Sequence, residues 1–174
     1  QAIGGGTAVL DYDLDGWPDL YLKQGGSDAP DFVSQRSNLL FRNVEGQFQD
    51  HTASSATEQF GYSIGLTSGD WNQDGFDDLV VANLGDIFLM LNNGDGTFRQ
   101  VRLKAPKADG ELISSLAMGD LSGNGLPDLY AAYYVEDPTM VKRPPIDAQG
   151  NIEVISPASF TPAIDKLIVN HGDG

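Results

Sequence analysis

The sequence predicts an all-β fold made of β-propeller blades, each with four antiparallel strands. A nine-residue stretch rich in Asp occurs three times, at 11–19, 70–78 and 120–128. The copies recur with a period of about 50 to 60 residues, which is typical of a repeat protein such as a propeller. Each period also holds short apolar stretches of strand type, and no helical periodicity interrupts them.

The first unit, residues 4–53, predicts one complete blade. Residues 7–10 are small or β-branched, and residues 19–23 alternate in the manner of a half-buried strand. A turn at Glu45 and Gly46 joins the last two strands. The four strands are expected at 7–10, 19–23, 38–43 and 47–52.

The second unit, residues 60–104, repeats this pattern. Its Asn-Gly-Asp-Gly segment at 93–96 predicts a hairpin turn, because Asn and Gly tolerate a positive φ angle. Small residues before each Asp-rich stretch favour the innermost strand of a blade, where neighbouring blades crowd around the axis. The strands are expected at 62–69, 78–83, 86–92 and 97–103.

The third unit, residues 111–174, is incomplete. Its strands are expected at 114–119, 128–134 and 166–170. Five prolines fall in 135–165, which is too long for an ordinary connection and is interpreted as an insertion. Propellers close with about four to eight blades. With two full blades and most of a third, residues 1–174 are expected to form one partial domain of a larger propeller.

The charge of the chain restricts its partners. The formal net charge is −15, so no basic surface is available to nucleic acid or to an anionic membrane. There are no cysteines, and therefore no disulfide framework. No apolar run is long enough to cross a membrane, and no signal peptide opens the chain.

The Asp-rich stretches predict calcium sites. Side-chain oxygens at positions one, three, five and nine, with a backbone carbonyl at position seven, suit the roughly six to eight oxygens that Ca²⁺ takes. Gly at position six allows the sharp reversal of the chain. About three ions are expected. The expected ligands are Asp11, Asp13, Asp15, Trp17 and Asp19; Asp70, Asn72, Asp74, Phe76 and Asp78; and Asp120, Ser122, Asn124, Leu126 and Asp128.

These loops differ from an EF-hand. Position twelve, where an EF-hand needs Glu, is Leu22, Val81 or Ala131, so Asp at position nine takes the closing role. The carboxylates fall from four to three to two along the chain, which predicts decreasing affinity in that order. The expected role of calcium is structural, because each loop ties two strands of one blade. The alternative is that the stretches are Asp-Gly turns without metal.

No catalytic group stands out in the sequence. His51 and His171 lie near turns without a ligand-spaced partner, so a solvated or packing role is expected for both. The chain has no Gly-x-Ser-x-Gly nucleophile motif and no obvious acid–base pair. Trp17 and Trp71 are expected to pack at the bases of the loops. The protein is therefore predicted not to be an enzyme.

The insertion 135–165 is the segment expected to carry specific contacts, since propeller loops bind partners while the blades act as scaffold. Tyr133, Tyr134 and the Met-Val-Lys-Arg segment at 140–143 supply the contact chemistry. The alternative of a disordered insertion stays open.

Several segments carry a family resemblance. Phe60 and Gly61, the Gly-Asp-Trp-Asn-Gln-Asp-Gly run at 69–75 and the Asp-Leu-Val-Val run at 78–81 resemble the FG-GAP/VCBS repeat of integrin α-subunit propellers and of many secreted bacterial proteins. Segments 38–43 and 89–98 are more narrowly similar to the cartilage acidic protein (ASPIC/UnbV) type. The resemblance implies a propeller with calcium in its loops and names no particular ligand.

The expected function is that of a non-catalytic, calcium-binding module for extracellular binding or adhesion to a protein or glycan. The chain is expected to be secreted, periplasmic or at the cell surface, with no nucleic acid partner and no membrane insertion. The remaining blades of the same propeller, or a second copy, are further expected partners. The alternatives are the propeller part of a secreted polysaccharide-active enzyme and a structural subunit of a larger assembly.

Overall fold

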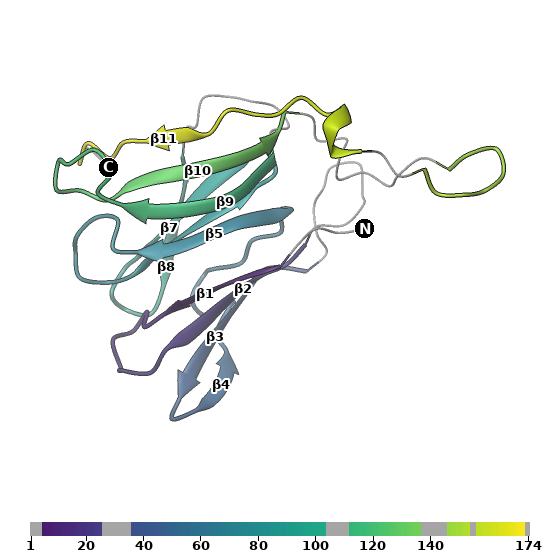
Figure 1. Cartoon of the computed structure of the whole chain (residues 1–174). Helices are drawn as coiled ribbons and strands as arrows, with labels where there is room; N and C mark the ends of the chain where they lie inside the picture. Colours follow the sequence, from purple (N-terminus) through teal and green to yellow (C-terminus); the bar gives the residue numbers. More distant parts are fainter. Residues whose placement is uncertain (1–4, 26–35, 104–111, 137–145, 154–155, 173–174) are drawn as a thin grey trace.

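A computed structural model describes residues 5–25, 36–103, 112–136, 146–153 and 156–172. Within these ranges, eleven β-strands form three antiparallel sheets, and the helical content is a single short 3₁₀ turn, η2 (Pro157–Ser159). Figure 1 shows the three sheets next to one another. The predicted all-β fold of antiparallel blades is confirmed.

Each sheet follows the order of the chain, so neighbouring strands are joined by hairpins. The first sheet contains β1 (Gly6–Leu10), β2 (Asp19–Lys23), β3 (Leu39–Val44) and β4 (Gln47–Asp50). The second contains β5 (Ser63–Gly69), β6 (Asp78–Asn83), β7 (Asp86–Asn92) and β8 (Phe98–Leu103). The third contains β9 (Leu112–Gly119), β10 (Asp128–Val135) and β11 (Lys166–Ile168).

The observed strands lie within two residues of the expected ones. The end of β4 shows why the boundaries differ. Oδ1 of Asp50 accepts hydrogen bonds from the backbone N–H and the hydroxyl of Thr52, at 3.0 Å and 2.6 Å. This local turn satisfies polar groups that would otherwise continue the ladder, so the strand stops at Asp50 instead of Thr52.

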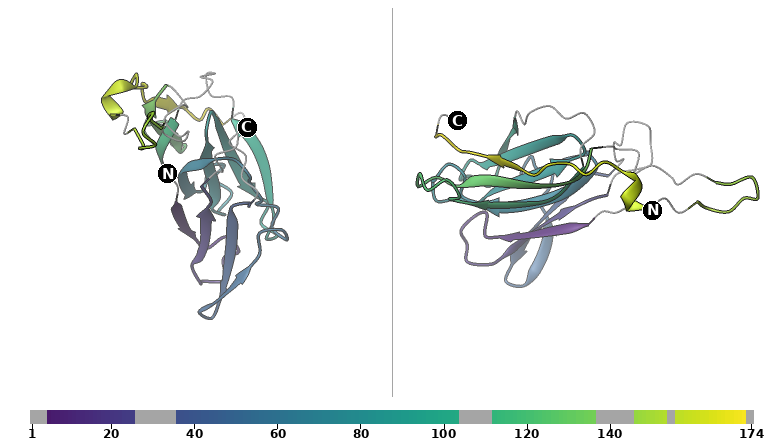
Figure 2. Two further views of the ribbon diagram at one scale, coloured as in Figure 1. Left: turned by 90° about the vertical axis from the view of Figure 1, so that its right-hand side faces the viewer. Right: turned by 45° about the horizontal axis from the view of Figure 1, so that its top comes forward.

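The first strands of the three sheets lie next to one another, with β5 between β1 and β9. β5 packs against both β1 and β9, and the two further views in Figure 2 show the same arrangement. Gly65 on β5 allows this approach, because a Cβ atom there would lie 3.1 Å from both Cβ of Ala82 and Cγ of Leu116. The strands with small residues therefore lie where neighbouring sheets come closest, as expected.

The middle sheet contributes to the two larger of the three hydrophobic clusters in the described residues; the third is a small cluster of Tyr62, Ile64, Leu112 and Val135. Every residue of β6 is buried, and its side chains alternate between the two neighbouring sheets. Leu79 and Val81 pack toward the first sheet, whereas Val80 and Ala82 pack toward the third. The first core also contains Ala8, Leu10, Tyr12, Tyr21, Leu40, Met90 and Phe98. The second also contains Trp71, Ile87, Leu89, Ile113, Leu116, Leu129, Ala131 and Tyr133.

The outer faces of the two end sheets have no covering sheet in the described part of the chain. On the first sheet, Val9 is 60% exposed and lies beside Leu20, which in turn lies beside Phe41. On the third sheet, Tyr130 and Leu167 are neighbours on exposed positions. An apolar sheet face of this kind is typical of a surface that another layer covers.

The expected insertion begins one residue later than predicted, because Val135 still belongs to β10. Figure 1 shows segment 146–153 projecting away from the sheets, and a bridge between Ile146 and Ile152 closes it. The contact role predicted for Tyr133 is wrong, because its ring is buried in the second core with Nζ of Lys166 4.4 Å from the ring centroid. Tyr134 is exposed, and the predicted contacts at 140–143 lie outside the described residues.

In the described ranges no helix has the length and apolar character needed to cross a membrane.

Candidate metal centre

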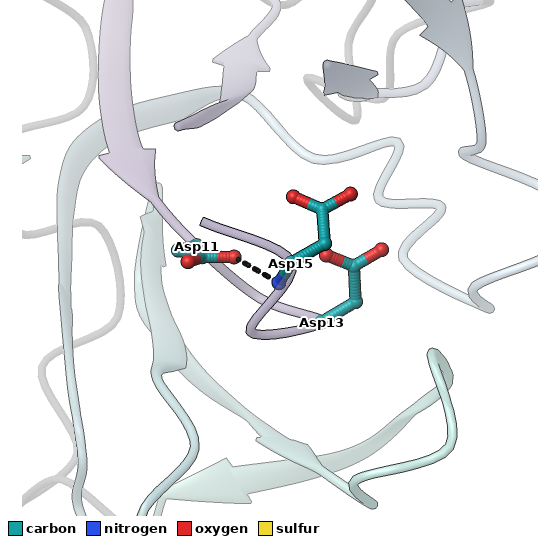
Figure 3. Close-up of side chains that lie close together, drawn as sticks. All are labelled: Asp11, Asp13 and Asp15. Atoms are coloured by element: carbon teal, nitrogen blue, oxygen red, sulfur yellow. Dashed lines mark hydrogen bonds between the residues drawn. The ribbon is translucent and has the colours of Figure 1, made fainter. Parts of the chain in front are cut away.

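The first Asp-rich loop, between β1 and β2, brings three carboxylates together. Oxygens of Asp11, Asp13 and Asp15 all lie within 4.8 Å of one another, and Figure 3 shows the three side chains converging. Asp11 shapes the loop, since its two oxygens accept hydrogen bonds from the backbone N–H groups of Asp15 and Gly16 at 3.1 Å and 2.9 Å.

Loop one meets the chemical requirement of a hard cation. Oδ1 of Asp13 is buried and has no hydrogen-bond partner. A buried carboxylate oxygen without a partner is costly, and a cation shared with two neighbouring carboxylates would satisfy it. The donor set of oxygens suits Ca²⁺ rather than a softer metal.

The Asp at position nine has a different place from the other predicted ligands. Asp19, Asp78 and Asp128 are fully buried, and Asp19 is not part of the cluster of three. Oδ2 of each accepts a hydrogen bond from the backbone N–H at position two, in Tyr12, Trp71 and Leu121. Oδ1 accepts one from an Asn on the third strand or, in the third sheet, two residues after it. These carboxylates clamp the loop to the sheet, and their role as metal ligands stays a prediction.

Burial sets the electrostatic state of these clamps. It raises the pKa of Asp78 to about 6, although hydrogen bonds from Asn92 and Trp71 work against the shift. Burial also raises the pKa of Asp19. At Asp128 burial acts in the same direction, but hydrogen bonds from Asn170, Ser122 and Leu121 outweigh it and the pKa falls below its ordinary value.

Loops two and three repeat the backbone of loop one with fewer carboxylates. Asp70 accepts hydrogen bonds from the N–H groups at positions five and six, at 3.0 Å and 2.9 Å, and Asp120 does the same at 3.1 Å and 3.0 Å. Asn72 donates to Asp74 at 2.8 Å, and Asn124 donates to the carbonyl of Asn170 at 2.8 Å. Among the described residues, neither loop contains a cluster of three carboxylates.

The remaining predicted ligands make hydrogen bonds that shape the loops, and their binding of metal stays a prediction. Ser122 donates its backbone N–H to Asp128 at 2.6 Å. The residues at position seven donate their N–H groups to the side chain at position five, at 2.8–2.9 Å, which fixes the turn. Their carbonyl oxygens stay predicted ligands. These residues are Trp17, Phe76 and Leu126.

Sequence reasoning missed a buried Asn at, or just after, the end of the third strand of each sheet. Asn43, Asn92 and Asn170 each donate the backbone N–H to the position-nine Asp, at 2.7, 2.7 and 3.0 Å. Each side-chain oxygen accepts the N–H of a Gly in the turn that follows, at 2.8–2.9 Å. The signal is weak because the Asp-to-Asn spacing differs among the sheets, at 24, 14 and 42 residues.

The same Asn residues connect neighbouring sheets. Nδ2 of Asn92 donates to the carbonyl of Tyr12 in loop one, at 2.7 Å, and Nδ2 of Asn170 donates to the carbonyl of Trp71 in loop two, at 3.0 Å. Because each Asn is also bonded to the Asp of its own sheet, an unbroken series of hydrogen bonds runs from loop one to loop three. We call this series the Asn relay; it consists of Asn92, Asp78, the backbone of Trp71, Asn170 and Asp128.

The aromatic and histidine predictions have mixed outcomes. Trp71 packs in the second core as expected, whereas Trp17 is 43% exposed, so the packing predicted for it is wrong. Nδ1 of His51 lies 3.2 Å from the hydroxyl of Tyr12. Burial, with the nearby charges of Asp13 and Asp19, raises the pKa of Tyr12 to about 12, so the phenol stays protonated and fits a packing role for His51. His171 is exposed.

One buried cation lies far from the loops. Lys23, at the end of β2, is 8% exposed, and its side chain lies across Gly6, the residue opposite it on β1. Burial lowers the pKa of Lys23 to about 8. A Cβ atom at position 6 would clash with Cε of Lys23 in this conformation, so a larger residue there would displace the Lys23 side chain.

The family model of the FG-GAP-like repeat matches this chain twice, at residues 11–81 and 70–131. The chain belongs to the FG-GAP-like repeat family. The two matched segments begin at Asp11 and Asp70, the first residues of loops one and two, and each segment spans two successive Asp-rich loops. The narrower cartilage acidic protein type stays a prediction.

The FG-GAP repeats of this chain are also similar to integrin α subunits. Human integrin alpha-7 is 27% identical over 180 residues, which cover 92% of this chain and 14% of the integrin. Integrin alpha-3 of Cricetulus griseus is 26% identical over 184 residues, which cover 93% of this chain and 17% of the integrin. The chain therefore spans only a small part of the length of these relatives.

Proposed function

We propose that this chain is the calcium-stabilised part of an extracellular, adhesion-type β-propeller that binds a protein partner and has no catalytic activity of its own. The observation that carries the calcium role is the convergence of Asp11, Asp13 and Asp15 around a buried oxygen that has no partner. Similarity to integrin alpha-7 and alpha-3 supports the adhesion role and a place at the cell surface or outside the cell.

Calcium would act in this site as a structural ion. It would be held by the three carboxylates of loop one, and by Asp70, Asp74 and Asp120 with neutral oxygens in the other two loops. The bound ion supplies the positive charge that offsets repulsion among carboxylates that are close together. Since each loop joins the first and second strands of a sheet, this charge stabilises the hairpin at its tip.

The uncovered outer faces support a larger propeller. A face on which Val9, Leu20 and Phe41 lie in a row would be buried by the next blade of a longer protein. We propose that this arrangement leaves the loops free for the partner. A glycan partner, a second copy of the chain and a polysaccharide-active enzyme are the competing proposals. The release of reducing ends from polysaccharides incubated with the chain would support the last of these.

A calorimetric calcium titration of the chelator-treated chain, followed by melting with and without the ion, tests the calcium role. About three ions are expected to bind, with a stabilisation of at least about 2.7 kcal/mol, the value for a single site at one hundred times its dissociation constant. Asp13→Asn should remove one ion from the stoichiometry. Asp147→Asn, a matched change in the exposed turn at 146–153, should remove none. No binding and an unchanged melt would show that the loops are turns without metal.

A further inference from the structure

A guanidinium group already occupies the rim of loop one. Nε of Arg42, on β3, lies 2.5 Å from Oδ2 of Asp13, and Nη2 lies 2.8 Å from Oδ2 of Asp15. The Nη2 contact is a hydrogen bond, whereas the Nε contact is not aligned as one and acts through charge. The two carboxylates are 17% and 25% exposed, so solvent screens the pairing only in part.

This cation is a feature of the first sheet. The Asn residues that bond to the position-nine Asp define equivalent positions on, or just after, the third strands, and the residues just before them are Arg42, Leu91 and Val169. Arg102 pairs with Asp86 away from the loops. Among the ion pairs between described residues, those that involve the Asp-rich loops are at loop one.

We propose that Arg42 is an internal competitor for calcium at loop one, an inference that rests on the proposed calcium role of the loops. An ion that binds Asp13 and Asp15 must displace the guanidinium or share the carboxylates with it. The positive charge of Arg42 also offsets the additional negative charge that the fourth Asp gives loop one relative to loop two. Loop one therefore binds calcium no more tightly than loop two, in contrast to the order expected from counting Asp residues.

The same contact has the opposite effect when calcium is absent. Arg42 holds Asp13 and Asp15 together without a metal, so loop one keeps its shape under chelation. In the part of the chain that the structure describes, no ion pair ties a basic side chain to loop two or loop three, so both loops are expected to loosen. The first sheet is then the calcium-independent part of the stack, and the second and third sheets are its calcium-dependent part.

Arg42→Leu tests the inference, because Leu is the residue that the second sheet has at this place. In a chain that also carries Asp70→Asn and Asp120→Asn, which leaves loop one as the intact site, we expect Arg42→Leu to raise calcium affinity at least tenfold in a calorimetric titration. The matched control, Arg102→Leu, removes the same charge from an exposed pair with Asp86 and should change the affinity by less than about twofold.

A second measurement avoids the triple variant in case it does not fold. In the otherwise unchanged chain, Arg42→Leu should lower the melting temperature in chelator and enlarge the rise on adding calcium, relative to Arg102→Leu. Equal calcium effects for the two variants would overturn the inference while leaving the proposed function intact. A parent chain that binds no calcium at any loop would instead overturn the proposed function.

Discussion

Replacing Asn92 with Ala tests the Asn relay directly. Asn92 is 3% exposed, and its side chain donates to the carbonyls of Tyr12 and Asp77 at 2.7 Å and 3.3 Å and accepts the N–H of Gly94 at 2.9 Å. Each net hydrogen bond contributes about 1 kcal/mol, and the groups left without partners are buried or half-buried. We therefore expect Asn92→Ala to lower the free energy of unfolding by about 3 kcal/mol.

The adjacent Asn93 gives a matched control. Its side chain is exposed and donates one hydrogen bond to the hydroxyl of Thr97 at 2.9 Å, so Asn93→Ala should cost no more than about 0.5 kcal/mol. Urea unfolding of the two variants and the parent, in excess calcium, measures both losses. If the two substitutions cost the same, the side chain of Asn92 does not brace the loops and the argument for the Asn relay is refuted.

Three further predictions follow from buried groups. The pKa of Asp78 is raised to about 6, so the stability that this carboxyl group contributes is full below its unfolded-state pKa near 3.8 and is lost as pH rises through 6. If calcium binds this carboxylate, a calcium titration at pH 5.5 should release protons, and one at pH 7.5 should release none. The pKa of Lys23 is lowered to about 8, so the contribution of this amine to stability is full above its unfolded-state pKa near 10.5 and is lost as pH falls through 8. Lys23→Met should therefore stabilise the chain by roughly 1–2 kcal/mol at pH 7 and by less at pH 10, as measured by thermal melting. A gain in stability that is independent of pH would contradict this prediction. Gly65→Ala should cost about 1–3 kcal/mol by forcing β5 from β9, whereas Gly119→Ala, which meets no atom within 4 Å, should be neutral in the same unfolding assay.

Much of the fold follows from local chemistry. The turn residues of the loops and of 93–96 separate short apolar stretches, and strands form where those stretches lie. β6 shows the limit of this reasoning. Its run of Leu, Val, Val and Ala predicts a buried strand, but only the position of the sheet between two others shows that its alternate residues belong to two different cores.

The parts that the sequence could not predict depend on contacts across the chain. Arg42 is 27 residues from Asp15, so no local spacing indicates their pairing. The bond from Asn170 to the carbonyl of Trp71 spans 99 residues. Trp17 was expected in the core because large aromatic residues favour burial, yet its place in the loop leaves it exposed to solvent.

The Asn relay has a direction. The loop of one sheet receives its bracing bond from the Asn of the following sheet: loop one from Asn92, and loop two from Asn170. At the first sheet, Asn43 donates to the carbonyl of Pro18 within its own sheet, at 3.0 Å, and in the described residues no earlier loop is there to receive its second amide hydrogen. Each blade therefore presents a donor on one side and an acceptor on the other. Blades with this polarity add head to tail, so a sequence of them has two chemically distinct ends, and closing it into a ring joins the first end to the last without a new kind of contact.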